Sequence, residues 1–375
     1  MLEDTVKKST FWVTQPMRIL HLDGLRGIAI ILVVLFHAYA GWPSQVPYGN
    51  TYADVTVFKL GWLGVELFFL VSGFVISITL EKTETFSLFI YKRWLRLFPA
   101  MLIATVLIYA TLAIFHERPD GIPPNLLSAL PGLTFMNWWP KLLNIDIPQL
   151  EVAFWTLYIE FKFYVIAGLT YYLFGKKYLT PVLVFLFALW VVTYGLTTQL
   201  EFHSLQLLAN INDALSLKHF GWFAAGSTCY RYYQTGDRKW MITTLLLILF
   251  SALSVRVETE GFNLEVTLSA LAISALFILS FKLTFLQNML QSRLLIFFGT
   301  ISYPLYLIHN NAMISMIIKI EASAPWLHSF LTPYPAIIVL VLAAYIIANY
   351  LEPWLSRFFR FQIESNIVKT KADMS

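Results

Sequence analysis

Residues 61–80, GWLGVELFFLVSGFVISITL, carry the pattern that decides the fold class of this chain. Glu66 is the only charged residue in the stretch, and a helix of about 20 apolar residues is long enough to cross the hydrocarbon core of a bilayer. Segments of similar character recur along the sequence. The predicted spans are Gly24–Trp42, Gly61–Leu80, Leu97–Phe115, Phe154–Phe174, Pro181–Leu196, Phe220–Tyr230, Met241–Val255, Val266–Phe281, Ile301–Ile318 and Ala336–Tyr350. We therefore predict an all-α, polytopic membrane protein with about ten transmembrane helices.

Composition indicates a single domain in a lipid bilayer. Of the 375 residues, 58% are hydrophobic and 13% are charged, which is more apolar surface than one soluble core can bury. No compositional break divides residues 1–375, so one domain is predicted, with its helices within about 24–351. The single cysteine, Cys229, excludes a disulfide framework and gives no zinc-site spacing, so no metal is expected. The net charge of +4 is dispersed at the ends of apolar segments, which argues against nucleic acid as a partner.

The distribution of basic residues predicts the topology. With a cytoplasmic N-terminus, 19 of the 26 Lys and Arg residues fall on inner ends and loops, and 6 fall on outer loops. This asymmetry predicts that both termini are cytoplasmic. The first span contains Arg26 and His37 and lacks a small-residue cleavage site, so we expect it to stay in the mature protein. The outer loop His116–Glu151 is longer than most connections, and such loops are commonly functional.

Two ionisable residues of the first span share one helix face. His37 follows Arg26 by eleven residues, which places it about 20° past three full turns and roughly 16 Å further along the axis. Ionisable groups at this depth are costly and usually face a protein interior or a water-filled cavity, which makes His37 a candidate catalytic residue. A hydrogen-bonded structural histidine is the alternative. For Arg26 the alternative is an anchor at the inner end, paired with Asp23 at i, i+3.

A second cluster of charge lies at the inner entry to the third span, where residues 91–99 read YKRWLRLFP. Arg93 and Arg96 are able to hold phosphate by forked hydrogen bonds, and Lys92 by its point charge. Topological anchoring explains the same residues equally well, because inner loops of membrane proteins are generally basic.

The fourth span contains both a carboxylate and an ammonium group. Within residues 154–164, FWTLYIEFKFY, Glu160 and Lys162 are two positions apart. They point in different directions on a helix, so each needs its own partner. Lys162 is expected to extend outward, which leaves Glu160 as the candidate for a buried role.

Three further candidates are weaker. Tyr303 and His309 lie in the ninth span, where aromatic side chains usually serve packing or the membrane interface. Glu66 is an additional candidate in the second span. Its neighbours Ser72 and Gly73 are small, and we expect this segment to serve close packing between helices.

Five blocks of the sequence resemble, in order, the motifs of acyltransferase family 3, a family of membrane acyltransferases that mostly modify bacterial surface polysaccharides. The first block resembles the family's Leu-Asp-Gly-Leu-Arg-Gly opening, with its signature of Arg, ten residues and His. The others resemble its Phe-Phe-x-x-Ser-Gly-Phe, Arg-x-x-Arg-Leu-x-Pro, Trp-Thr-Leu-x-x-Glu and Ser-Tyr-x-Leu-Tyr-Leu-x-His blocks. They occupy His21–His37, Gly64–Phe74, Arg93–Pro99, Trp155–Tyr164 and Ser302–His309. Each block alone is weak evidence, whereas five in order span the chain.

The resemblance implies an O-acyltransferase of the cell inner membrane. The implied donor is acyl-coenzyme A, commonly acetyl-coenzyme A, entering from the cytoplasm, and the implied acceptor is a hydroxyl of a surface glycan or glycolipid. Some members continue into a soluble hydrolase-like domain. This sequence ends about 25 residues after its last predicted span, so we expect no such domain here.

The resemblance also suggests a mechanism. The cations of residues 91–99 would bind the donor phosphates while the thioester reaches toward His37. Neutral His37 would take the proton of the acceptor hydroxyl, or would carry the acyl group covalently. Arg26 would orient the donor or offset negative charge, and Glu160 would orient His37 or the acceptor.

Two other classes of protein fit the same residues. A transporter of acyl groups or glycan intermediates would use the ionisable side chains as a pathway. A structural or assembly protein would use them only to join helices. Absence of label transfer by purified protein would favour the transporter, and a His37→Ala variant with altered stability alone would favour the structural protein.

Overall fold

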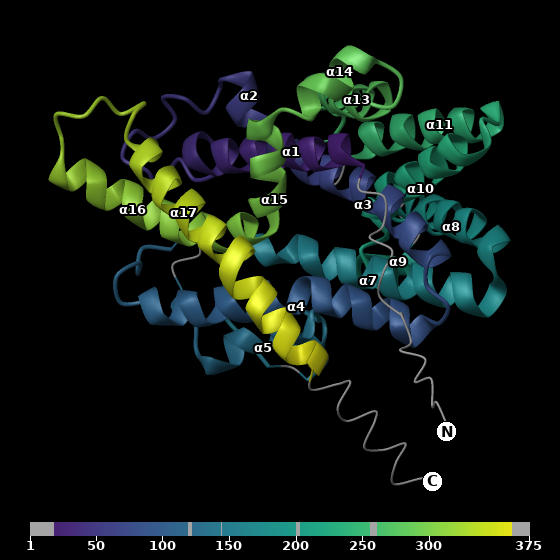
Figure 1. Cartoon of the computed structure of the whole chain (residues 1–375), viewed down its shortest axis with the longest axis horizontal. Coiled ribbons are helices and arrows are strands. Elements are labelled where there is room, and N and C mark those ends of the chain that lie inside the picture. Colours follow the sequence, from purple (N-terminus) through teal and green to yellow (C-terminus); the bar gives the residue numbers. More distant parts are fainter. Residues whose placement is uncertain (1–18, 119–121, 144, 200–202, 256–260, 362–375) are drawn as a thin grey trace, which may run out of the picture.

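The computed structural model describes residues 19–118, 122–143, 145–199, 203–255 and 261–361 (Figure 1). Within these ranges the regular elements are all helical, which confirms the predicted all-α class. The α-helices are α1 (Leu20–Tyr39), α2 (Thr56–Lys59), α3 (Gly64–Glu81), α4 (Phe86–Thr111), α5 (Ala129–Thr134), α6 (Trp139–Leu142), α7 (Trp155–Leu169), α8 (Lys176–Tyr194), α9 (Gln206–Leu215), α10 (Phe220–Thr235), α11 (Arg238–Ser254), α13 (Leu264–Leu279), α14 (Thr284–Leu290), α15 (Arg293–Ile308), α16 (Asn310–Ser323) and α17 (Pro333–Ile346).

Several of these helices are continued by turns of tighter or wider winding. The 3₁₀ segment Gly61–Leu63 precedes α3, and Val152–Phe154 precedes α7. The π-helical segments Thr170–Phe174, Gly195–Gln199 and Ile347–Leu351 follow α7, α8 and α17. These turns lengthen the helices toward the dimension of a bilayer.

Length and composition of the helices indicate a multi-pass membrane protein. Among the described residues, six helical segments are long and apolar enough to cross a membrane. They are Leu20–Tyr39, Gly61–Glu81, Phe86–Thr111, Val152–Phe174, Lys176–Thr197 and Pro333–Phe361. The number becomes seven if α13 and α14, which are bent by 100°, form one span. The predicted sixth and seventh spans are helices too, α10 and α11, but with 16 and 17 residues they are shorter, so ten crossings stay a prediction.

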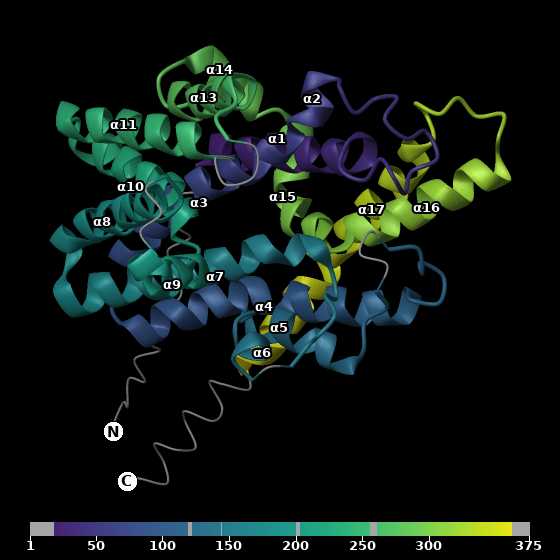
Figure 2. The same cartoon turned by 180° about the vertical axis from the view of Figure 1, so that it is seen from behind.

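The predicted ninth span, Ile301–Ile318, is wrong as a single helix. The chain forms α15 up to Ile308 and a separate helix, α16, from Asn310, with His309 at the break. α15 and α16 run in clearly different directions in both views (Figure 1, Figure 2). Pro304 lies one turn before the break, and because proline has no backbone N–H it removes a hydrogen bond from the last part of α15.

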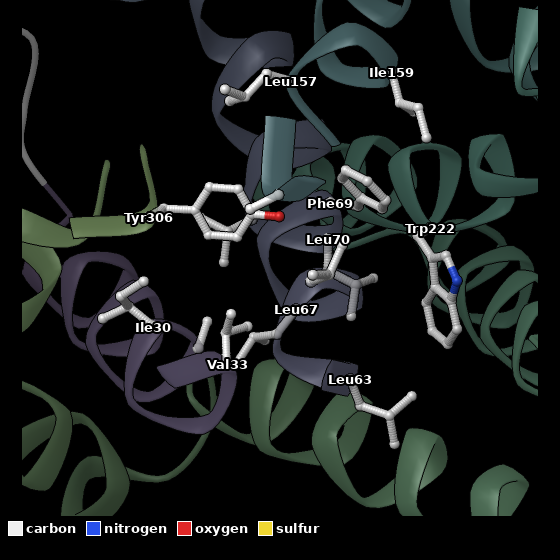
Figure 3. Close-up of a cluster of buried hydrophobic side chains, with 14 of the residues drawn as sticks. Ile30, Val33, Leu63, Leu67, Phe69, Leu70, Leu157, Ile159, Trp222 and Tyr306 are labelled. Carbon is white, nitrogen blue, oxygen red and sulfur yellow. The ribbon is translucent and has the colours of Figure 1, made fainter. Parts of the chain in front are cut away.

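The helices form two layers that face each other. In both views α4 and α7 lie side by side beneath α1 and α3 (Figure 1, Figure 2). Between α1 and α3 the side chains of Ile30, Val33 and Leu67 are fully buried, and Tyr306 of α15 lies close to them (Figure 3). This apolar contact fixes the rotation of α1, and therefore the direction in which its polar residues point.

Glycines allow the closest contacts between helices. A Cβ added to Gly73 of α3 would lie 2.1 Å from the carbonyl oxygen of Phe223 in α10, and one added to Gly226 of α10 would lie 2.1 Å from that of Leu70. Such distances permit no side chain, as is typical of small residues at helix contacts in membranes. The prediction that Gly73 serves close packing is therefore confirmed.

This contact gives a stability prediction. The Gly73→Ala variant is expected to lose about 1–3 kcal/mol of stability, because its new methyl group must push α3 and α10 apart. Thermal unfolding in detergent measures the effect. Gly195→Ala is the matched control, since a Cβ there meets no atom within 4 Å. Equal unfolding temperatures for the two variants would contradict the packing role.

Candidate active site

Five of the predicted site residues, from four helices, meet in one pocket between the two helix layers. The pocket contains about 700 Å³ of empty space, a volume that includes open solvent. Its lining residues come from α1, α3, α4, α7 and α15: they are Arg26, Val65, Phe68, Phe69, Arg93, Arg96, Leu97, Thr156, Leu157, Glu160, Tyr164, Ser302, Tyr303 and Tyr306. The lining therefore includes five predicted candidates, Arg26, Arg93, Arg96, Glu160 and Tyr303.

Cations dominate the charge of this pocket. The i, i+3 spacing of Arg93 and Arg96 places both on the face of α4 that lines it, while Lys92 is not among the lining residues. The guanidinium group of Arg93 lies over the ring of Tyr164, 5.9 Å from its centroid, and the buried Nε of Arg93 has no hydrogen-bond partner. Arg96 is more exposed, with Nη1 3.4 Å from Oε1 of Glu352. Three guanidinium groups thus line the pocket.

Glu160 is the carboxylate in the lining. Its Oε1 accepts hydrogen bonds from the hydroxyl of Ser72, at 2.7 Å, and from that of Tyr164, at 2.5 Å. Lys162 points elsewhere, as predicted, and donates to the carbonyl oxygen of Ala214 at 2.7 Å. The hydrogen bonds of Glu160 therefore come from Ser72 and Tyr164. That Glu160 orients His37 stays a prediction.

Sequence reasoning missed some residues of this site. Ser72 was assigned to helix packing, although its hydroxyl holds Glu160. Tyr164, Thr156 and Tyr306 were read as parts of larger motifs, and all three line the pocket. All of these residues lie inside the five sequence blocks, which could have marked them as candidates. The blocks show positions along the chain, but they do not show which side chains contact one another.

A pair of histidines lies directly behind Tyr306. The ring centroids of His37 and His309 are 4.8 Å apart, and His309 Nε2 lies 3.1 Å from His37 Nδ1. Tyr306 connects the pair to the pocket, since its ring is in the lining and its carbonyl oxygen is 2.9 Å from His309 Nδ1. Its hydroxyl accepts a hydrogen bond from Thr156 at 2.9 Å. His309, a weak candidate from sequence, is therefore the direct partner of His37.

The hydrogen bonds fix the tautomers of both neutral rings. A carbonyl oxygen only accepts, so His309 carries its proton on Nδ1, bonded to Tyr306, and its Nε2 must accept. The proton between the rings therefore belongs to Nδ1 of His37, which also lies 3.0 Å from the carbonyl oxygen of Val33. Neutral His37 consequently presents an unprotonated Nε2, the form required of a general base.

The remaining candidates lie outside the pocket lining. Lys92 and Asp23 are on α4 and α1, and the carbonyl oxygen of Asp23 faces α15 at Gly299. Glu66 is buried on α3, where Oε1 lies 3.8 Å from Nδ1 of His219. In the described part of the chain, no group of three or more His, Cys, Asp or Glu side chains is arranged to hold a metal ion.

Comparison with known proteins places the chain in a family. The model of an acyltransferase domain matches residues 19–351. Peptidoglycan O-acetyltransferase OatA of Listeria monocytogenes is 29% identical over 163 residues, and O-acetyltransferase OatA of Staphylococcus aureus strain NCTC 8325 is 30% identical over 157 residues. Each match covers 39% of this chain and 23% of the relative.

A third relative is matched over most of its length. The putative acetyltransferase ORF330 of Acidianus two-tailed virus is 25% identical over 296 residues, which is 76% of this chain and 80% of that protein. No solved structure matches the chain. Because the family model covers most of the sequence, the chain belongs to acyltransferase family 3, the family that its five sequence blocks resemble.

Proposed function

We propose that this protein is an integral membrane O-acyltransferase that transfers an acetyl group from acetyl-coenzyme A to a hydroxyl of a cell-surface glycan. The observation that carries the proposal is a pocket lined by three guanidinium groups and a single carboxylate, next to a histidine with a free ring nitrogen. The names of the three relatives support acetyl as the acyl group, and the name of the Listeria relative supports a glycan acceptor.

The cationic pocket suits the phosphates of an acyl-coenzyme A donor. Arg93 and Arg96 offer forked donors on one helix face, and the buried Nε of Arg93 is a donor without a hydrogen-bond partner. We assign these two side chains to donor binding. The charge of Glu160 acts on both Arg26 and Arg93 and partly balances them, so the pocket keeps a positive excess that favours an anion.

His37 is assigned the proton transfer. Its Nε2 takes the proton of the acceptor hydroxyl while the hydroxyl oxygen forms the new ester bond with the thioester carbonyl carbon. The carbon–sulfur bond then breaks, and the proton passes from His37 to the sulfur, so coenzyme A leaves as the thiol. The His37 cation formed in between is stabilised because its Nδ1–H keeps its hydrogen-bond acceptors on His309 and Val33. Arg26, which lines the donor pocket roughly 16 Å along α1 from His37, is assigned to orienting the donor.

We further propose ten crossings of the cell inner membrane with both termini cytoplasmic, counting α15 and α16 together as the ninth. The excess of Lys and Arg on the predicted inner loops supports this arrangement. It places Arg93 and Arg96 near the cytoplasmic side, where the donor enters, and His37 deeper in the membrane.

Transfer of label tests the proposed function. Protein in nanodiscs receives radiolabelled acetyl-coenzyme A together with fragments of bacterial surface glycans, and ester-bound label on the glycan is measured. We expect time-dependent labelling that requires the protein. Label that crosses the bilayer of a proteoliposome without appearing on any glycan would contradict the enzyme and support a transporter.

A further inference from the structure

The break between α15 and α16 is held by a buried carboxylate that no sequence block contains. Glu151 is 3% exposed, and His309, at the break, is completely buried. We propose that Glu151 is a positioning residue that fixes this break and thereby holds the His309 ring against His37. This inference rests on the proposed function, because it assigns Glu151 to the same reaction.

Two contacts join Glu151 to the residues that follow His309, and a third joins Asn310 to Trp42. Oε1 accepts a hydrogen bond from the side-chain amide of Asn310 at 3.2 Å, and Oε2 lies 3.5 Å from the backbone N–H of Asn311. The side-chain oxygen of Asn310 in turn accepts from the indole N–H of Trp42 at 2.8 Å. Glu151 therefore caps the N-terminus of α16, where a negative charge is favourable, and Asn310 links that cap to the end of the first span.

The backbone that leads into Glu151 is itself held in place. Arg118 is buried and donates from Nη2 to the carbonyl oxygens of Gln149, at 3.2 Å, and Leu150, at 2.6 Å. Glu151 follows immediately, and the chain then enters α7, which carries Thr156 and Glu160 into the pocket. Glu151 thus connects the start of α7 to the break beside His309.

This arrangement affects the tautomer of His37. His309 must present its Nε2 to His37 Nδ1–H, and its other nitrogen is bound to Tyr306 one turn earlier in α15. Release of Asn310 frees the residue next to His309, so that the backbone of His309 can shift and carry its ring away from Nδ1 of His37. A buried carboxylate is expensive in a membrane domain and usually serves a function, and here its hydrogen bonds lead to the histidine pair.

The decisive variant is Glu151→Gln, which keeps the shape and replaces one acceptor oxygen by a donor. We expect kcat for acetyl transfer to fall about 10- to 100-fold, because a shift of about 1 Å in a catalytic group has effects of this size. The KM for acetyl-coenzyme A is expected to stay constant, since Arg93 and Arg96 are untouched. Trp42→Phe, which removes only the N–H that holds Asn310, is expected to act in the same direction with smaller amplitude.

Glu117→Gln is the matched control. Glu117 lies in the same loop as Glu151, residues 116–151. It accepts a hydrogen bond from Ser315 of the same helix, α16, but it lies away from the break. This control tests whether the loss of any hydrogen bond between this loop and α16 lowers the rate of acetyl transfer. We expect kcat close to that of the wild type, and an equal loss in both Gln variants would overturn the inference.

A double-mutant cycle tests whether Glu151 acts through His309. If it does, the combination of Glu151→Gln with His309→Ala should be no slower than His309→Ala alone, because the second change removes the group that the first one misplaces. Losses that multiply would overturn the proposed route.

A spectroscopic measurement separates this inference from the proposed function. The ring nitrogen resonances of His37 are recorded in protein labelled with ¹⁵N-histidine in nanodiscs, and assigned with the His37 and His309 variants. We expect the protonated Nδ1 resonance to shift in Glu151→Gln and to stay in place in Glu117→Gln. If wild type transfers no label, the proposed function fails, and this spectrum still decides the inference. An unchanged Nδ1 resonance in Glu151→Gln overturns it.

Discussion

Replacement of His37 by alanine is expected to lower kcat for acetyl transfer about 10³-fold, which is within the usual contribution of a general base. The variant keeps the donor pocket, because His37 is not among its lining residues. Its affinity for coenzyme A should therefore equal that of the wild type. Initial rates of label transfer and calorimetric titration with coenzyme A measure the two quantities.

A second readout separates catalysis from folding. The wild-type rate is expected to fall in acid, where the free Nε2 of His37 becomes protonated, and this acid limb should disappear from the residual rate of His37→Ala. His328→Ala is the control, because His328 is exposed and accepts a hydrogen bond only from the nearby backbone N–H of Phe330. A His37→Ala enzyme with normal kcat would refute the assigned role.

Replacement of Arg93 or Arg96 by alanine is expected to weaken coenzyme A binding about 10- to 100-fold each. Hydrogen bonds to charged groups contribute about 1.5–3 kcal/mol, and about 1.4 kcal/mol corresponds to a factor of ten. Arg93 is the more buried of the two, so its removal should have the larger effect and the smaller dependence on salt. Calorimetric titration at two salt concentrations measures both trends.

The truncated donor S-acetylpantetheine provides the internal control, because it carries the thioester without phosphates. With this donor, wild type and the arginine variants should transfer acetyl at similar rates. Arg357→Ala removes an exposed cation five residues after Glu352, the ion-pair partner of Arg96. Its side chain bonds only to the carbonyl oxygen of Pro353, and the change should leave coenzyme A affinity unchanged. Equal weakening by Arg357→Ala would attribute the effect to general charge. Lys92→Ala is expected to have a smaller effect than either arginine variant.

Features that depend on neighbours along the chain were predictable from sequence. The apolar segments gave the helical class, because in lipid each backbone N–H must find its partner within the same segment. The i, i+3 spacing placed Arg93 and Arg96 on one face of α4, and both line the pocket. The predicted ninth span was wrong because an apolar run predicts a helix through residue 309, whereas Pro304 and the contact of Glu151 with the first turn of α16 favour a break there.

The sequence by itself determined the helical membrane class, the family, and the positions of Arg26 and His37 along one helix, since helix periodicity is a local property. Only the tertiary structure decided that His309 is the partner of His37, 272 positions away, and that Glu160 is held by Ser72. These contacts depend on how close the helices approach and how they rotate, which buried glycines and apolar side chains on several helices set together. No spacing along one segment contains that information.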